Sequence, residues 1–298
     1  MLPDTVRFGT SSWAYEGWKG QVYKQAYPKS RFAKNCLKEY AACEYGGRRL
    51  FRTVGVDHSF YRPPAATQWK DYAAQVPDDF RICAKVWEEI TIPAFAGHPR
   101  YGQKAGKPNP RFLDAALCEE LVLAPAREGL GDRAGPMIFE FQRSGLDPES
   151  FIPALDRFLS KLPSGHPYAV EVRNPAILGT RYHDVLNAHG AAHVYNHWTF
   201  MPALAEQHKR MERFTAPFTV LRLLTPLKMS YEQAKKRAGA YDKIVGELPE
   251  MRRDTVGLVT QAVAENRQTY VLVNNRAEGN APATIQAIVD ELETQMSS

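Results

Sequence analysis

The sequence has few cysteines, no long apolar run and no strong excess of one charge. Its four cysteines are spread through 298 residues without a CxxC pair, which argues against a disulfide framework or a zinc site of ordinary spacing. No apolar run approaches the roughly 18 residues of a membrane span. The first residues lack the basic start and apolar core of a signal peptide. We therefore expect a cytoplasmic protein with buried thiols and no membrane partner.

The common catalytic and phosphate-binding fingerprints are also missing. No GxGxxG follows the first expected strand, no GxxxxGK[ST] occurs, and neither GxSxG nor HExxH is present. Five of the eight histidines fall between 183 and 208, but their spacing matches no metal motif. No metal ligands are therefore predicted and the cofactor stays unknown. A divalent metal remains open, because carboxylates and histidines follow several strands.

Composition and charge leave most globular functions open. The chain is 44% hydrophobic and 24% charged, which is ordinary for a globular protein. A net charge of +5 and a pI near 8.9 permit an anionic ligand or nucleic acid and require neither. The length fits one large α/β barrel of roughly 250 residues with additions. The oligomeric state is not indicated.

Short apolar segments alternate with helical segments along the whole chain. Eight such units favour a parallel sheet closed into a barrel. We predict an α/β fold, a single-domain TIM-like (β/α)8 barrel over residues 1–298, with an open doubly wound sheet as the alternative. The strands are expected at 6–12, 50–56, 80–86, 135–142, the first half of 168–175, 191–195, 218–224 and 270–273. Among the helices, one is expected over 231–248.

A long segment at about 93–112 interrupts the alternation after the third strand. It contains four prolines, three glycines and four positive charges, and no acidic residue lies between 99 and 112. Proline and glycine at this density exclude a regular element. We interpret the segment as a Pro/Gly-rich basic insertion, and whether it acts as a lid is left open.

Polar and ionisable residues stand at almost every expected strand end. In TIM barrels the active site lies at the carboxyl ends of the strands. Glu171 and Arg173 alternate with valines, so both can face the barrel axis, with Glu171 deeper. We predict Glu171 and Lys85 as catalytic. The predicted substrate-binding residues are Thr10, Trp13, Asp57, Tyr61, Gln142, Arg173, His197, Arg222, Asn274, Asn275 and Glu278.

Structural roles compete with these assignments. Lys85 and Glu171 could form an ion pair inside the barrel, with Arg222 as a strut. Asp57 and Asn274 could cap turns or helices, as short polar side chains often do. Trp13 is more simply explained as part of an apolar wall. Charges of both signs gathered in one place nevertheless favour a site, because buried charges must be paired.

Five segments, in order along the chain, resemble the domain of unknown function 72 (YecE-like) family. The matching segments are 9–20, 53–62, 80–85, 170–175 and 274–282. The resemblance implies a TIM-like barrel and no established reaction. The chain departs from the family pattern at three strand ends. It has Gly55 and Asp57 where the family has a Glu and, two residues later, the Asn that follows the second strand, and it has Ile92 and Leu224 where the family has histidines. A mechanism that needs those histidines is therefore disfavoured.

We consider three functions. The first is an enzyme acting on a small polar or anionic substrate, with Glu171 as acid or base and Lys85, Arg173 and Arg222 binding the anion. Hydrolase, isomerase and lyase chemistry all fit. The second is a nucleic-acid-binding or -processing barrel that uses the basic segment and nearby aromatic residues. The third is a non-catalytic ligand-binding barrel.

Overall fold

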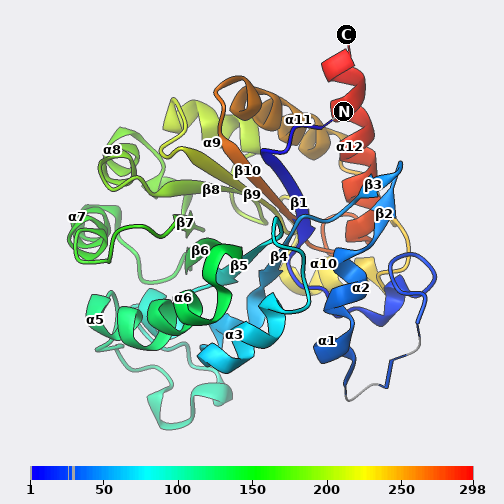
Figure 1. Ribbon diagram of the computed structural model, residues 1–298. Helices are drawn as coiled ribbons and strands as arrows, with labels where there is room; N and C mark the ends of the chain where they lie inside the picture. The colour runs from blue at the N-terminus through cyan, green and yellow to red at the C-terminus, as the bar shows by residue number, and fades with distance from the viewer. Residues whose placement is uncertain (1, 26, 29–30, 298) are drawn as a thin grey trace.

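Eight parallel strands surround the axis of the molecule, with helices outside them (Figure 1). The computed structural model describes residues 2–25, 27–28 and 31–297. The strands are hydrogen-bonded in the order β1-β10-β9-β8-β7-β6-β5-β4. Their bounds are β1 Val6–Thr10, β4 Thr53–Val56, β5 Arg81–Lys85, β6 Ala134–Phe141, β7 Tyr168–Val172, β8 Ala192–His197, β9 Phe218–Leu223 and β10 Gln268–Val273. All eight expected strands form, so the predicted α/β, TIM-like architecture is confirmed.

The barrel closes at the seam between β1 and β4. No ladder between these two strands appears among the described residues, but the backbone amide of Arg52 donates to the carbonyl of Phe8 at 2.9 Å. Gly9 allows this approach, because a Cβ there would lie 2.0 Å from the carbonyl oxygen of Thr53. The seam therefore brings the first and last strands of the sheet together into a nearly closed barrel.

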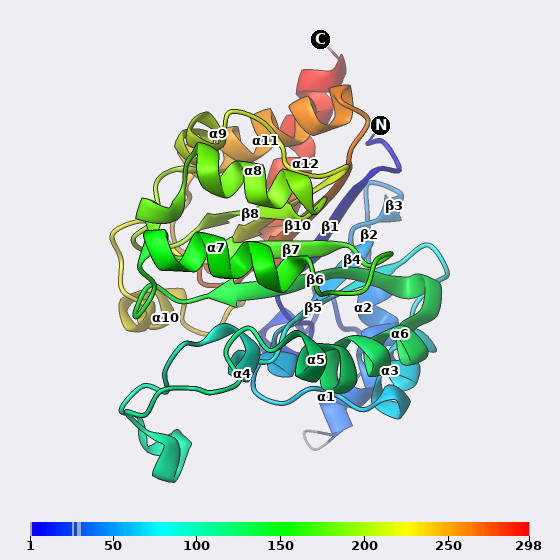
Figure 2. The ribbon, with the colours of Figure 1, turned by 90° about the vertical axis from the view of Figure 1, so that its left-hand side faces the viewer.

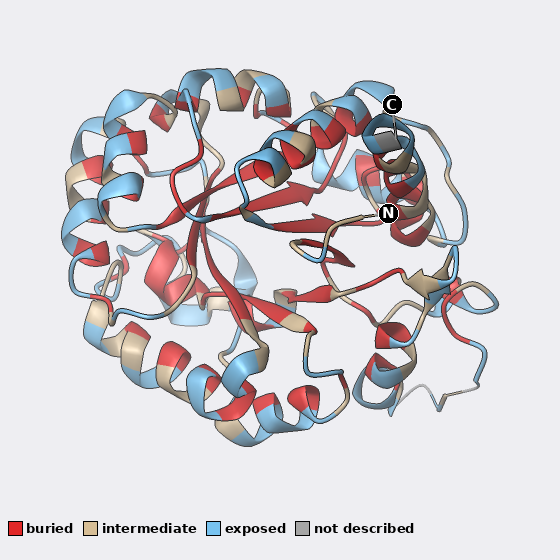
Figure 3. Ribbon diagram, turned by 45° about the horizontal axis from the view of Figure 1, so that its top comes forward, coloured by how far each residue is buried: buried red, intermediate tan, exposed pale blue. Residues whose placement is uncertain are grey.

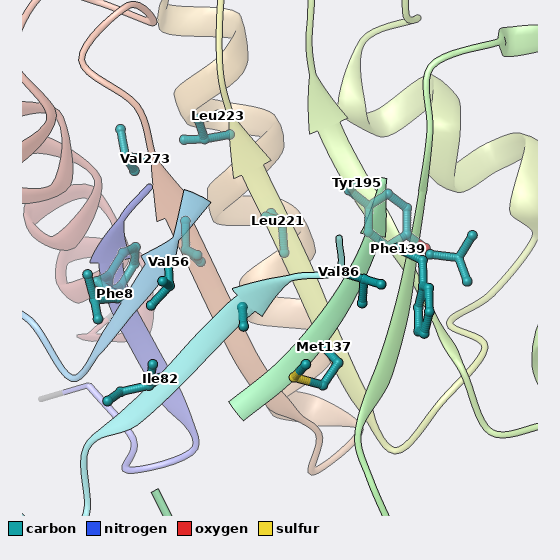
Figure 4. Close-up of a cluster of buried hydrophobic side chains, with 14 of the residues drawn as sticks. Phe8, Val56, Ile82, Val86, Met137, Phe139, Tyr195, Leu221, Leu223 and Val273 are labelled. Carbon is teal, nitrogen blue, oxygen red and sulfur yellow. The ribbon is translucent and has the colours of Figure 1, made fainter. Parts of the chain in front are cut away.

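Two apolar layers hold the barrel. The larger one lies between the strands and the helices and includes Phe8, Val56, Phe139 and Leu221 (Figure 4). The smaller one fills the barrel interior and includes Cys83, Ile138, Ala169, Val194, Val220 and Leu272. The strands are therefore buried on both faces, whereas the helices expose their outer sides (Figure 3). Above the inner apolar layer, the interior becomes charged.

The outer helices follow their sequence signals. For example, in α7 Asp147 accepts the amide of Ser150 at the N-terminus, and Phe151, Leu155 and Phe158 face the core. The helices are α1 Phe32–Asn35, α2 Leu37–Ala41, α3 Ala66–Ala73, α4 Glu88–Thr91, α5 Ala115–Cys118, α6 Ala124–Leu130, α7 Pro148–Leu159, α8 Thr180–Ala188, α9 Leu204–Met211, α10 Tyr231–Ala238, α11 Pro249–Ala264 and α12 Ala281–Ser297. Among the residues that the structure describes, none of the helices combines the length and the hydrophobicity of a membrane-spanning segment.

Two local expectations need correction. The helix predicted over 231–248 ends as α10 at Ala238, because Gly239 takes a positive φ of 60° and turns the chain. A small antiparallel hairpin, β2 Glu44–Tyr45 with β3 Arg48–Arg49, was not predicted. Gly46 and Gly47, with φ of 57° and 74°, supply its turn.

The segment 93–112 extends from the barrel as an irregular arm. Its base is tied by an antiparallel bridge between Ala94 and Pro108 and by the amide of Phe95 donating to the carbonyl of Lys107 at 3.0 Å. A short 3-10 helix, Pro99–Lys104, forms within it. Figure 2 shows this segment and α10 on the side of the barrel away from the labelled chain ends. The carboxyl ends of the strands lie on that same side.

Candidate functional site

Three cationic side chains, two on strands β5 and β9 and one directly after β7, meet at one carboxylate oxygen above the inner apolar layer. Oε2 of Glu140 lies 2.7 Å from Nζ of Lys85, 2.7 Å from Nη2 of Arg173 and 3.0 Å from Nη1 of Arg222. The side chain of Glu140 is only 2% exposed, so solvent screens these contacts little. Gln142 donates to the other oxygen of Glu140.

Two further carboxylates complete the cluster. Nη1 of Arg222 donates to Oε2 of Glu171, and Nε of Arg173 donates to Oε1 of Glu171 at 3.1 Å. Nη2 of Arg222 reaches both oxygens of Asp57, at 3.0 and 3.3 Å. Glu171 is fully buried, whereas the side chain of Asp57 is 32% exposed. The cluster thus contains three cations and three carboxylates, and only part of it faces the solvent.

Strand register explains why these side chains converge. Glu140 on β6 is the register partner of Glu171 on β7. Both alternate with apolar neighbours that pack against the helices, so both carboxylates point into the barrel. Arg222 lies on β9, opposite Asn196 of β8. The predicted direction of Glu171 and Arg173, with Glu171 deeper, agrees with this arrangement.

Sequence reasoning missed Glu140. The candidates were sought at the ends of the strands, and Gln142 was the one chosen from β6. The signal was nevertheless present, because Glu140 stands between Phe139 and Phe141 and shares the parity of Gln142. A carboxylate inside an apolar strand needs a buried partner. Lys85 pairs with Glu140. The structural alternative had instead paired Lys85 with Glu171.

The cluster forms the floor of a pocket of about 410 Å³, here called the charged pocket. It opens where the strands end. Five cations and two carboxylates line it, so positive charge is in excess even when the buried Glu171 is included. The lining residues are Ser12, Tyr15, Asp57, His58, Phe60, Tyr61, Lys85, Arg100, Glu140, Gln142, Arg173, Trp198, Arg222, Leu224, Thr225, Tyr231, Asn274 and Arg276.

Arginine–aromatic pairs surround the mouth of the charged pocket. The guanidinium carbons of Arg100, Arg173 and Arg276 lie 5.1, 4.7 and 4.5 Å from the ring centres of Tyr61, Trp198 and Tyr231, respectively. Each pair joins two segments that follow neighbouring strands of the barrel. Such contacts hold flat guanidinium groups in place while leaving their N–H edges available for hydrogen bonds.

Burial and charge shift the titration of the central groups. Burial alone would raise the pKa of Glu140, but the positive charges of Arg173, Lys85 and Arg222 outweigh it and hold the pKa well below its usual range. Burial opposes the charge of Arg222, yet Glu171, Asp57 and Glu140 together raise its pKa. Glu140 is therefore ionised at neutral pH. Burial lowers the pKa of His58 at the pocket wall.

The structure places seven of the thirteen predicted site residues on the wall of the charged pocket. These are Asp57, Tyr61, Lys85, Gln142, Arg173, Arg222 and Asn274. Glu171 lies directly beneath it, bonded to two of them. Asn274 uses its side-chain oxygen to accept the amide of Arg276 at 3.0 Å, which shapes the loop after β10.

The remaining five predicted residues lie outside the charged pocket. The hydroxyl of Thr10 donates to the carbonyl of Ser12 at 2.7 Å, and Nε1 of Trp13 donates to the carbonyl of Ala33 at 2.8 Å. Both side chains are buried in structural contacts. Nδ1 of His197 lies 2.8 Å from the carbonyl oxygen of Thr225.

Asn275 and Glu278 serve the loop after β10. Oδ1 of Asn275 accepts Nε1 of Trp18 at 3.1 Å and the amide of Ala281 at 2.8 Å. Glu278 is fully buried and forms an ion pair with Arg252, with 2.8 Å between Oε2 and Nη2. Both residues thus tie the loop to distant elements.

Metal ligands do not gather anywhere in the part of the chain that the structure describes. No group of three or more His, Cys, Asp or Glu side chains there is placed to hold a metal ion. The three carboxylates of the cluster are separated by the cations that they bind.

The comparisons with known proteins agree on one family. The model of the family described as "Protein of unknown function DUF72" matches residues 7–298. A DUF72 family protein from Enterococcus faecalis superposes with a TM-score of 0.66 at 16% identity, covering 97% of this chain and 95% of that one. A DUF72 family protein from Thermotoga maritima gives 0.61 at 18% identity, covering 97% and 99%. No curated protein matches the chain.

Proposed function

Because the chain belongs to the DUF72 family of proteins of unknown function, we propose from its own site that it is an enzyme acting on a small polar or anionic substrate. The reaction would take place in the charged pocket at the carboxyl ends of the barrel strands. One observation carries the proposal: Lys85, Arg173 and Arg222 converge on a single oxygen of Glu140 at the floor of that pocket.

A purely structural role explains this cluster poorly. Removing charges from water costs several kcal/mol per ion, and an apolar barrel interior of the same volume is often as stable or more stable. In this barrel the middle of the interior is apolar, and the charged cluster lies in the layer directly beneath the pocket. Ionisable groups with perturbed pKa values that gather in a cleft are typical of functional sites.

The cations are suited to binding the substrate. The side chains of Lys85 and Arg173 are 11% and 13% exposed, so both can reach a ligand from the pocket floor. A carboxylate or phosphate oxygen of the substrate would accept hydrogen bonds from the same ammonium and guanidinium groups that now donate to Glu140. Arginine can bind such groups through two parallel hydrogen bonds. The excess of positive charge on the lining favours an anion.

The acid–base role has two candidates. Glu171, which the sequence favours, has no exposed surface and binds two arginines. Asp57 lines the pocket and is partly exposed, so it can contact a ligand without rearrangement. We assign acid–base catalysis to Asp57 first and to Glu171 second. Glu140 is not a candidate, because its low pKa makes it a weak base. Its role is to bind and position the three cations.

The experiment measures binding and turnover with defined anions. Inorganic phosphate, acetate, citrate and a set of sugar phosphates are titrated against wild type, Lys85→Met and Arg173→Met by calorimetry. We expect at least one probe to bind to the wild type and each variant to weaken it at least tenfold. Arg181→Met is the matched control, since Arg181 is 59% exposed and pairs only with surface Glu149 in the described structure.

Two results would contradict the proposal. One is that no probe binds to the wild type at millimolar concentration. The other is that both variants, folded by circular dichroism, bind as tightly as the control. If a probe binds, turnover by Asp57→Asn and Glu171→Gln then separates the two acid–base candidates. Binding that never leads to turnover of any related compound would favour the non-catalytic ligand-binding barrel.

The nucleic-acid alternative has less support from the geometry. The positive side chains of the 93–112 segment are largely paired: Arg100 lies 2.6 Å from Glu88, and Lys104 lies 2.6 Å from Glu89. Arg111 also reaches Glu89, at 2.8 Å. Trp13 and Trp18, two aromatic residues that could stack on bases, are buried. A nucleic-acid strand would therefore contact fewer unpaired cations and exposed aromatic rings in this segment than the sequence suggests.

A further inference from the structure

A second pocket adjoins the charged pocket and differs from it in character. It has a volume of about 400 Å³ and is here called the side pocket. Three residues, Phe60, Arg100 and Gln142, line both pockets, so the two spaces share a wall. The residues that line the side pocket are Phe60, Glu88, Ile92, Pro93, Ala94, Phe95, Ala96, Arg100, Tyr101, Gln142, Ser144 and Gly145.

The side pocket is mainly apolar. Its walls come from the irregular segment after α4, from the loop after β6 and from Phe60. Ile92 and Phe95 are buried and give it a hydrocarbon base. The charged groups at its edge neutralise each other, because Arg100 and the hydroxyl of Tyr101 both lie within 2.9 Å of Oε2 of Glu88. Little uncompensated charge remains there to bind an ion.

The junction joins a charged surface to an apolar one. Nζ of Lys85 lies 4.0 Å from the ring centre of Phe60 on the side of the charged pocket, and Phe60 also lines the side pocket. Gln142 crosses the boundary and donates to Glu140 on the floor. A ligand whose anionic group sits on Lys85 and Arg173 can therefore extend past Phe60 onto apolar walls.

We propose that the substrate is an amphipathic organic anion: a carboxylate or phosphate group bound in the charged pocket, carrying an apolar or aromatic arm that fills the side pocket. The inference rests on the proposed function, since it assumes that the charged pocket binds an anion. It adds the substrate class and assigns specificity to the segment that includes Phe95, Ala96 and Tyr101. Apolar burial supplies the extra affinity, with about a fourfold gain per buried methylene.

The test compares anions that share a head group and differ only in the arm. Methylphosphonate and a series of phenylalkylphosphonates with one to four methylenes are titrated by calorimetry, and acetate and the matching phenylalkanoates are run in parallel. We expect the best member of a series to bind the wild type at least tenfold more tightly than its armless head group. Phosphonates are used because they lack a hydrolysable ester bond.

Two variants fill the side pocket from different chain segments. Ala96→Trp and Ser144→Trp each place a large side chain at an exposed position of its wall. Each should remove the advantage of the arm and leave methylphosphonate or acetate affinity within twofold. Leu121→Trp is the control, because Leu121 is 37% exposed and lies outside both pockets. The Leu121→Trp variant should bind the armed anions as much more tightly than the head groups as the wild type does.

The outcomes separate this inference from the proposed function. If methylphosphonate or acetate binds but no arm improves affinity more than threefold, the amphipathic ligand is wrong and the anion site stands. The amphipathic ligand is equally wrong if the two filling variants retain the advantage of the arm. If neither head group nor any longer member binds, the anion site itself fails and this inference fails with it.

Discussion

At the scale of single residues, Glu140 connects the cations of the cluster. It accepts from Lys85, Arg173 and Arg222 through one oxygen. Without its charge, three buried or half-buried cations would share only Glu171 and Asp57. Glu140 therefore determines whether the pocket floor is preorganised, even if it never contacts a reacting atom.

Replacing Glu140 with glutamine should destabilise the protein. Removing one partner of a buried ion pair costs about 3 kcal/mol or more, because the remaining charges stay buried without compensation. We expect the free energy of unfolding, measured by urea titration, to fall by ~3 kcal/mol in Glu140→Gln. The matched control is Glu149→Gln, which breaks an exposed pair with Arg181 and should change stability by less than about 1 kcal/mol. Equal effects of the two changes would refute the central role of Glu140.

The same residue predicts a pH dependence. The pKa of Glu140 is lower in the folded protein than its ordinary value of 4.5, so below that value the unfolded chain binds the proton more readily. The stabilisation from Glu140 is complete above about pH 4.5 and is lost as the pH falls towards the folded pKa. The stability difference between wild type and Glu140→Gln should therefore shrink on acidification. A difference that stays constant from pH 7 to pH 3 would contradict this.

At the scale of elements, the strand alternation does most of the positioning. β6 and β7 each place a glutamate inside and aromatic or valine side chains outside, and their register sets the two glutamates side by side. Arg173 directly follows β7, and Arg222 comes from β9. The site thus depends on the closure of the barrel at the β1–β4 seam, where Gly9 permits close backbone approach.

Gly9→Ala should disrupt that seam. A Cβ at Gly9 would lie 2.0 Å from a backbone oxygen of β4, so one strand must shift. Overpacking of this kind costs about 1–3 kcal/mol or more. Gly257→Ala in α11 is the control, since Gly257 is exposed and a Cβ there meets nothing within 4 Å. It should be neutral or stabilising by up to ~1 kcal/mol. Thermal unfolding decides, and a Gly9→Ala protein as stable as the control would exclude the tight seam.

At the scale of the whole molecule, the sequence predicted the architecture better than the site. Continuous apolar runs bounded by polar residues mark buried parallel strands, so all eight strands could be located without a structure. The register between neighbouring strands could not be read from the sequence in the same way. Strand register places Glu140 beside Glu171 and within reach of Lys85.

Long-range pairing explains the predicted site residues that lie outside the pocket. Asn275 and Glu278 follow a strand, as a binding residue would, but their partners Trp18 and Arg252 come from other parts of the chain. Nothing local distinguishes such a residue from one that faces a ligand. Asp57 and Arg173 have equally ordinary local sequences, and they face the pocket because the strand order brings their loops together.

The overall charge leads to the last prediction. The net charge of +5 is modest for 298 residues, and most of the cations in segment 93–112 are paired with Glu88 and Glu89. Binding of a single-stranded 30-mer DNA, followed by fluorescence anisotropy, should therefore be weak at 50 mM salt and absent at 200 mM, because few phosphates are neutralised. Lys104→Ala/Lys107→Ala should leave phosphonate binding in the charged pocket unchanged. Tight DNA binding that survives 200 mM salt and is lost in this double variant would favour the nucleic-acid function over the small-anion enzyme.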